Sequence, residues 1–128
     1  MNAFEVTGGR KLKGTIIPQG AKNEALQILS AVLLTPEPVE ITNVPDILDV
    51  NLLIELLQDM NVHVAKKGDG HFLFRADDVD MDFVHSDAFR RKSGRLRGAV
   101  MLAGPMLSRF RRAYIPKPGG DKIGRRRL

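Results

Sequence analysis

The chain has 128 residues, a normal length for one domain, and its 43% hydrophobic and 27% charged residues are typical of a soluble globular protein. It has no cysteine, no secretory signal at its start and no apolar run near the roughly 20 residues that cross a bilayer. These features exclude disulfides, thiolate metal sites and a membrane-spanning helix, and we expect a cytoplasmic protein. The net charge is +5, and residues 109–128 contain eight bases and one acid, so we expect an anionic partner for this end of the chain.

Two strands and a helix are predicted for residues 4–34. Residues 4–6 and 12–16 predict short strands, the second by its alternation of apolar and polar residues, and Pro18-Gln19-Gly20 ends them. Residues 21–34 predict a helix, because apolar residues recur there at helical spacing. Lys22 and Asn23 open this helix. A lysine is unfavourable at the positive end of the helix dipole, so Lys22 either meets an anion there or points into water.

The next 41 residues predict a strand, a helix and a hairpin. Residues 39–42 alternate as a strand, and residues 50–60 predict an amphipathic helix that Asp46 or Asp49 can cap. Two further strands, 62–65 and 71–75, flank Gly68-Asp69-Gly70, which is typical of a hairpin turn. The predicted order from residue 21 to residue 75 is therefore helix, strand, helix, strand, strand.

The last third of the chain gives weaker signals. Ser93 predicts the N-cap of a third helix that runs through Leu107, is kinked or split at Gly104-Pro105, and has Arg97 in its first turn. Residues 112–116 predict a strand, and a further helix is expected from Ile123. That helix has no stop signal before the sequence ends, so we expect a truncated domain.

Bases stand at or near three predicted helix starts: Lys22, Arg97 and the segment 119–126. Helix N-termini and free N–H groups attract negative charge, and arginine binds phosphate through strong, often bidentate hydrogen bonds. If these starts meet, they form a site for one or two phosphorylated ligands. The alternative is three unrelated bases in water.

Other kinds of site find little support. The three histidines lack the spacing of metal ligands, and the acids of residues 77–82 lack the pattern of a calcium loop, so we expect no metal and no cofactor. Nucleic-acid binding is disfavoured because the basic end offers only Phe110 and Tyr114 for base stacking. Strand edges left unpaired by a truncation would allow self-association.

Four motifs resemble those of the enolpyruvyl transferases. They are residues 19–26 (Gln-Gly-Ala-Lys-Asn-Glu-Ala-Leu), residues 38–45 (Pro-Val-Glu-Ile-Thr-Asn-Val-Pro), residues 96–99 (Leu-Arg-Gly-Ala) and residues 118–124 (Pro-Gly-Gly-Asp-Lys-Ile-Gly). They occur together and in the family's order, and the resemblance covers essentially the whole chain. The shikimate-pathway members differ after their Gly-x-Lys motif and fit less well.

The resemblance implies an α/β fold (α+β, with a mixed sheet) that is part of a two-domain inside-out α/β barrel, built of helix-strand-helix-strand-strand units. Family members are much longer than this chain and place the active site between their domains. Residues 1–20 would then pack with the second domain, and residues 21–128 would form an incomplete first domain.

The resemblance also implies a reaction and its residues. The members that this chain resembles most transfer the enolpyruvyl group of phosphoenolpyruvate to the 3′-hydroxyl of UDP-N-acetylglucosamine, the first committed step of peptidoglycan synthesis, and release phosphate. Lys22 would bind phosphoenolpyruvate, Asn23 the sugar nucleotide and Arg97 phosphate, while Arg126 would hold phosphoenolpyruvate from the other side. The carboxylate that deprotonates the hydroxyl and a second arginine would lie beyond Leu128, so we expect the isolated chain to be inactive.

Asp121 stands where many family members carry a cysteine, the proposed general acid and the target of fosfomycin. The resemblance therefore implies that Asp121 is catalytic and that the full-length enzyme resists fosfomycin. The alternative is that Asp121 caps the helix after Gly120. Two other functions stay open at this stage: a non-catalytic module that binds phosphorylated ligands, and a basic fragment that binds nucleic acid.

Overall fold

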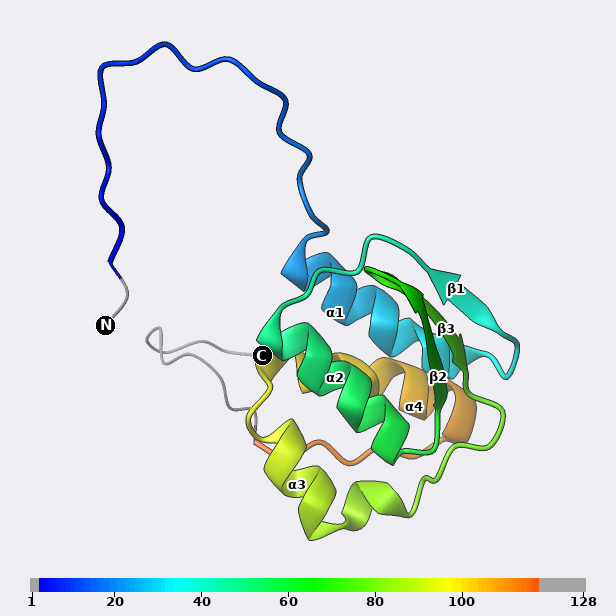
Figure 1. Cartoon of the computed structure of the whole chain (residues 1–128). Coiled ribbons are helices and arrows are strands. Elements are labelled where there is room, and N and C mark those ends of the chain that lie inside the picture. The colour runs from blue at the N-terminus through cyan, green and yellow to red at the C-terminus, as the bar shows by residue number, and fades with distance from the viewer. Residues whose placement is uncertain (1–2, 118–128) are drawn as a thin grey trace.

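The computed structural model describes residues 3–117, which form a small sheet with helices and an extended N-terminal stretch (Figure 1). The elements in chain order are α1 (Lys22–Ala31), η1 (Val32–Leu34), β1 (Val39–Ile41), α2 (Leu48–Asp59), β2 (His63–Gly68), β3 (His71–Arg75), η2 (Phe83–His85), α3 (Asp87–Ser93), η3 (Arg97–Leu102) and α4 (Ala103–Phe110), where η marks a 3-10 helix. The predictions of the first helix, the strand after it, the second helix and the hairpin are confirmed, with boundaries shifted by a few residues.

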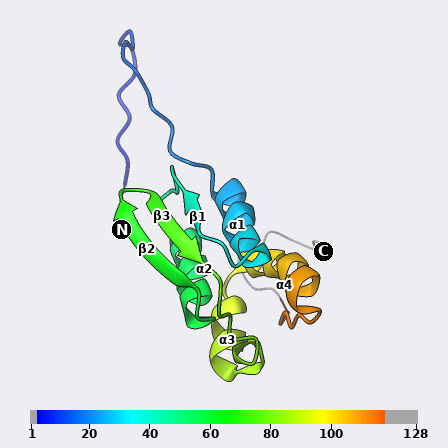
Figure 2. The same cartoon turned by 90° about the vertical axis from the view of Figure 1, so that its right-hand side faces the viewer.

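The sheet has three strands in the order β1-β3-β2, and both pairs are antiparallel. The mixed sheet that the family implies is therefore not seen within residues 3–117. Phe74 of β3 lies opposite Val39 of β1 and Val64 of β2, so these three side chains share one face. Phe74 is fully buried, which identifies this face as the one packed on the core. The helices gather on one side of the sheet (Figure 2).

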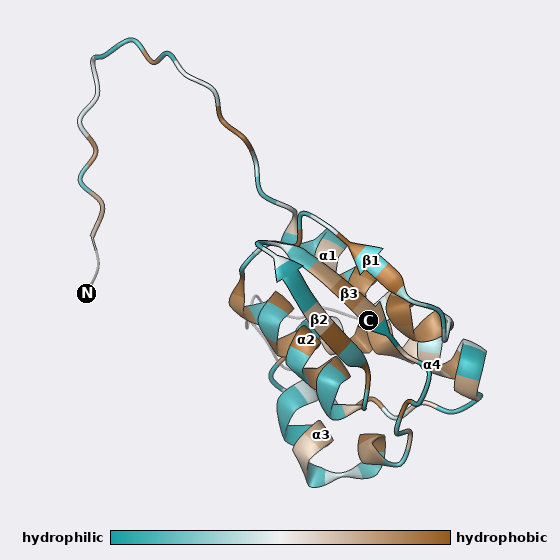
Figure 3. Ribbon diagram, turned by 45° about the vertical axis from the view of Figure 1, so that its right-hand side comes forward, coloured by the Kyte–Doolittle hydropathy of each residue, from teal (hydrophilic) through white to brown (hydrophobic). Residues whose placement is uncertain are grey.

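The core is made mainly of the apolar faces of α1 and α2 and the inner face of the sheet. In α2 the buried residues recur at helical spacing, so the helix has one apolar and one hydrophilic side (Figure 3). The fully buried large side chains include Leu29, Leu33, Leu53, Leu57, Phe74, Phe89 and Met106. Helix α1 packs on both α2 and η3. Its contact with η3 brings together segments that are about 70 residues apart in sequence.

The two predicted N-terminal strands are wrong for the described residues. Residues 3–20 contain no strand and leave the body of the molecule (Figure 1). A strand needs a neighbour to pair its backbone groups, and no strand of residues 21–117 lies beside this stretch. Its large apolar side chains are consequently at least 89% exposed: Phe4, Val6, Leu12, Ile16 and Ile17.

The predicted helix from Ser93 to Leu107 is confirmed only in part: residues 97–110 are helical and split after Leu102, but Ser93 is not the N-cap. The cap is Ser86, whose Oγ accepts a hydrogen bond of 3.0 Å from the Phe89 N–H and begins α3. Ser93 ends that helix, where its buried hydroxyl donates to the Phe89 carbonyl at 2.6 Å. The chain then forms η3 and α4, and Pro105 stands in the first turn of α4, where a missing N–H costs nothing.

Residues 112–116 do not form the predicted strand. Side-chain contacts hold this segment on the body instead of a sheet ladder. Arg112 pairs with Asp82 at 3.0 Å, and the Tyr114 ring lies 5.5 Å from the His85 ring. The described residues include no helix that is both long and apolar enough to traverse a bilayer.

Candidate functional site

The start of α1 is fixed against the loop that follows β1. A Cβ on Gly20 would lie 2.1 Å from the Asn43 carbonyl oxygen and 3.0 Å from Pro45, so only glycine permits this approach. Ala21 is the N-cap and has an extended backbone, and no side chain of the described residues caps the first N–H groups of α1. Backbone N–H groups at a helix start that lack a side-chain partner are donors suited to an anion.

Lys22 meets an anion from the protein itself. Its Nζ donates to Asp49 Oδ2 at 3.1 Å, and this ion pair joins the first turn of α1 to the first turn of α2. A lysine at the N-terminal end of a helix is unfavourable, whereas an aspartate there is favourable, so the pair offsets the cost of Lys22. The Lys22 side chain therefore does not simply point into water, although the pair is on the surface.

Asp49 is the residue that sequence reasoning assigned wrongly. It was expected, with Asp46, as a cap of the second helix, but the N-cap of α2 is Ile47, with no side-chain cap among the described residues. Asp46 instead accepts a hydrogen bond of 2.8 Å from the Asn51 amide. The position of Lys22 could have indicated this partner. A lysine at the positive end of a helix dipole is unfavourable, so a nearby acid is expected.

Arg97 begins η3, which packs against α1. The contact is very close at the next residue: a Cβ on Gly98 would lie 2.8 Å from Leu26 Cδ1. Leu26 is four residues after Lys22, so the two lie on the same side of α1. The backbone at Arg97 therefore lies beside the helix that presents Lys22. Arg97 is half-buried, and Asn23, the second residue of α1, is exposed.

Two of the predicted site residues, Asp121 and Arg126, lie outside the described residues. Of the remaining three, Lys22 and Asn23 share the first turn of α1. Arg97 is the first residue of η3, which packs on that helix. The packing of η3 on α1 places the Arg97 backbone near this helix, and a joint site of Lys22, Asn23 and Arg97 stays a prediction. The start of α2 is joined to that of α1 by the ion pair of Asp49 with Lys22.

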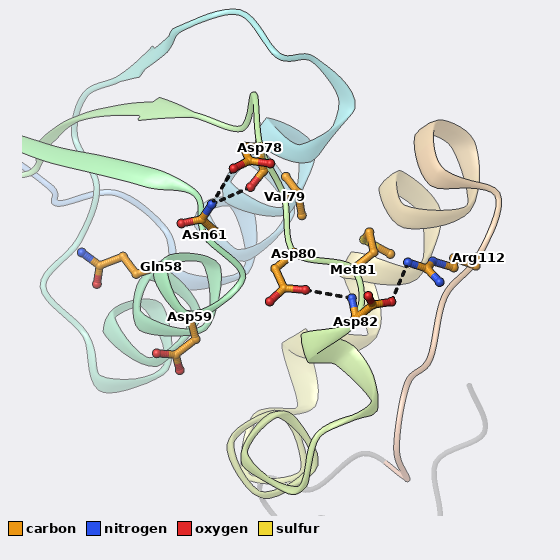
Figure 4. A pocket seen from close by; sticks show the side chains of 9 residues that line it. All are labelled: Gln58, Asp59, Asn61, Asp78, Val79, Asp80, Met81, Asp82 and Arg112. Carbon is orange, nitrogen blue, oxygen red and sulfur yellow. Dashed lines mark hydrogen bonds and ion pairs between the residues drawn. The ribbon is translucent and has the colours of Figure 1, made fainter.

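A hollow of the described residues lies elsewhere (Figure 4). It has a volume of about 650 Å³ and is lined by Gln58, Asp59, Asn61, Asp78, Val79, Asp80, Met81, Asp82 and Arg112. Asp59 ends α2, so this hollow is about 15 Å along the helix from Asp49. Its four aspartates would repel a phosphorylated ligand. Within the described residues no three histidines or acids are grouped to hold a metal ion.

A smaller hollow of about 90 Å³ lies beside the start of α1. It is lined by Gly20, Ala21 and Glu24 on one side and by residues 41–45 on the other. Neither of these two hollows is lined by Lys22 or Arg97.

The chain is similar to known proteins over essentially its whole length. The model of the family described as EPSP synthase (3-phosphoshikimate 1-carboxyvinyltransferase) matches residues 6–127. Over 128 residues the chain is 57% identical to the UDP-N-acetylglucosamine 1-carboxyvinyltransferase of Bacteroides thetaiotaomicron and 56% identical to that of Porphyromonas gingivalis. All of this chain and 30% of each relative are covered, so the chain spans about a third of the length of these relatives.

A solved structure is also similar. The enolpyruvyl transferase NikO from Streptomyces tendae matches 80% of this chain and 23% of its own chain, with a TM-score of 0.63 and 27% sequence identity. The similarity in structure therefore extends to a protein with far lower sequence identity than the two relatives above.

Proposed function

The chain belongs to the enolpyruvyl transferase family, and from this premise we propose that it is the N-terminal part of a UDP-N-acetylglucosamine 1-carboxyvinyltransferase. The observation that carries the proposal is the identity of 57% over all 128 residues to a relative of that name. The adjacent starts of α1 and η3, with Lys22 and Arg97, support it because the reaction handles two phosphorylated substrates.

The proposed reaction joins phosphoenolpyruvate to UDP-N-acetylglucosamine. The 3′-hydroxyl of the sugar gives its proton to a carboxylate beyond residue 128, its oxygen bonds to C2 of phosphoenolpyruvate, and the methylene carbon takes up a proton, which gives a tetrahedral adduct. Loss of a proton from the same carbon and departure of phosphate then restore the double bond. The phosphate gains negative charge as it departs, and both substrates carry phosphate groups, so positioned cations stabilise the bound substrates and the leaving group.

Each site residue has one role in this proposal. Lys22 binds phosphoenolpyruvate, Asn23 binds the sugar nucleotide and Arg97 holds the phosphate. Arg126 grips phosphoenolpyruvate from the other side, and Asp121 is the catalytic acid. The half-buried state of Arg97 and the exposure of Asn23 suit contact with ligands in a cleft that further residues close.

The domain arrangement is part of the same proposal. Residues 21–128 form an incomplete first domain of an inside-out α/β barrel, and residues 1–20 pack with a second domain that this chain does not contain. The exposed apolar side chains of residues 4–17 support this, because they find a partner only outside residues 21–117. The isolated chain then lacks half of the cleft and is inactive.

Asp121 gives the full-length enzyme resistance to fosfomycin in this proposal. A cysteine thiolate is a strong nucleophile that an electrophilic drug alkylates stably, and a carboxylate at the same position is a much weaker one.

A chimera tests the proposed function. In it, this chain replaces the matching residues of the Bacteroides thetaiotaomicron relative, and the product formed from phosphoenolpyruvate is identified by mass spectrometry. We expect the enolpyruvyl ether of UDP-N-acetylglucosamine, and no product when shikimate 3-phosphate is the acceptor. Product from shikimate 3-phosphate alone would contradict the proposal. Binding of both substrates by the chimera without any product would favour the non-catalytic binding module.

A further inference from the structure

The ion pair of Lys22 and Asp49 is partly exposed: the side chains are 41% and 36% accessible to solvent. It joins residues 27 positions apart, at the first turns of two helices that pack on each other. The ammonium group has three N–H donors, and Asp49 occupies one of them. Among residues 3–117 no other acceptor is bonded to Lys22, so two donors face outward from this part of the chain toward a ligand that approaches the start of α1.

We propose that Asp49 is a positioning residue that holds the Lys22 ammonium at the start of α1 and, by its own negative charge, weakens the binding of phosphoenolpyruvate and of product phosphate. The inference rests on the proposed function, in which Lys22 binds phosphoenolpyruvate. It adds a residue that acts on the substrate through Lys22 and sets how readily the anions leave.

Distance and charge determine the sign of the effect. An anion that accepts a hydrogen bond from Lys22 Nζ lies within about 6 Å of an Asp49 carboxylate that is 3.1 Å from the same nitrogen. At that separation the two negative charges repel each other. The anion must also share or displace a partner that Lys22 already has. Removal of the Asp49 charge should therefore tighten binding, whereas a damaged site would weaken it.

The size of the effect follows from exposure. Solvent screens a surface pair, so its partners interact weakly, and we expect a change of about twofold to fivefold. A merely structural role for Asp49, as an acid that favours the start of α2, predicts no tighter binding of any anion.

Asp46 provides a matched control. It carries the same charge three residues earlier, before the same helix, but it is bonded to Asn51 and not to Lys22. Asp46→Asn therefore removes one negative charge near the start of α2 without releasing the Lys22 ammonium.

The experiment measures the KM for phosphoenolpyruvate and the inhibition constant for inorganic phosphate with the chimera described above. For Asp49→Asn we expect both constants to fall together by about twofold to fivefold, and for Asp46→Asn neither to fall. Asp49→Ser, which keeps a residue suited to a helix start, should give the same result as Asp49→Asn and replaces it if that variant does not fold.

Three outcomes would overturn the inference. The first is that the parent chimera is active but neither the KM for phosphoenolpyruvate nor the inhibition constant for phosphate falls in Asp49→Asn and Asp49→Ser. This result would overturn the inference and leave the proposed function standing. An equal fall in Asp46→Asn would do the same, because the effect would then come from net charge. A parent chimera that forms no product from the two substrates would instead overturn the proposed function, and the inference with it.

Discussion

Gly98 at the start of η3 packs directly on Leu26 of α1, and a Cβ at position 98 would lie 2.8 Å from Leu26 Cδ1. This contact sets how near the Arg97 backbone comes to the helix that presents Lys22. We expect Gly98→Ala to destabilise the chain by about 1–3 kcal/mol, because the added methyl group overpacks the contact. The midpoint of urea unfolding, followed by circular dichroism, measures the change.

Gly104 is the control for that substitution. It lies in the first turn of α4, and a Cβ there would meet no atom within 4 Å. Helix propensity favours alanine at position 104 and the following proline disfavours it, so we expect Gly104→Ala to change the stability by less than about 1 kcal/mol. Equal destabilisation by both substitutions would show that the Gly98 contact is not special.

The apolar side of α2 carries much of the core. Leu53 is fully buried, and we expect Leu53→Ala to lower the free energy of unfolding by about 2–5 kcal/mol through lost burial and a cavity. Leu48, in the same helix, is 72% exposed, so Leu48→Ala should change the free energy of unfolding by no more than about 0.5 kcal/mol. Urea unfolding of the two variants checks this, and a larger loss for Leu48→Ala would contradict the assigned buried face.

Glu40 makes stability depend on pH. The hydrogen bond with the His71 ring, 2.6 Å long, and the charge of Lys67 lower the pKa of the Glu40 carboxyl below its ordinary value of 4.5. A carboxyl whose pKa is lower in the folded state stabilises the fold above 4.5 and loses that contribution as the pH falls through the lowered pKa. We therefore expect the urea midpoint of the wild type to be higher than that of Glu40→Gln at pH 6. The difference between the two midpoints should shrink as the pH is lowered.

Glu37→Gln is the matched control, because it removes the same charge from the turn just before β1. The measurement is the urea midpoint of the three proteins from pH 6 to pH 3. An advantage of wild type over Glu40→Gln that grows as the pH falls would have the wrong sign for the contact with His71.

Asp121 is expected to protect the full-length enzyme from fosfomycin. We expect the chimera to keep its activity during incubation with the drug, and Asp121→Cys to lose activity progressively, because a thiolate attacks the electrophile. Asp69→Cys places a thiol on the fully exposed tip of the hairpin and should not inactivate. Rapid inactivation of the chimera with Asp121 in place would refute the prediction.

Local patterns predicted much of the fold. Helical spacing identified α1 and α2, and Gly68-Asp69-Gly70 identified the hairpin, because these elements depend on neighbours in sequence. The strands of residues 4–16 were predicted wrongly because pairing depends on a distant partner. Ser86, and not the predicted Ser93, is a helix cap, and its hydrogen bond is to Phe89, which is buried in the core.

The candidate site depends on distant contacts in the same way. Helix starts and the family motifs predict Lys22, Asn23 and Arg97 as site residues, and that assignment stays a prediction. Asp49 was missed as the partner of Lys22, because the ion pair depends on how α1 packs on α2 and joins residues 27 positions apart. No local pattern contains that relationship.

We propose that the cations at the starts of α1 and η3 act on phosphoenolpyruvate in the completed enzyme. The most direct test is phosphate release from phosphoenolpyruvate and UDP-N-acetylglucosamine by the chimera with Lys22→Gln or Arg97→Gln. Lys66→Gln, on the exposed strand β2, serves as the control. We predict that each site substitution lowers kcat/KM by about 100-fold or more and that the control does not. Activity of both site variants within about threefold of the parent would contradict the account.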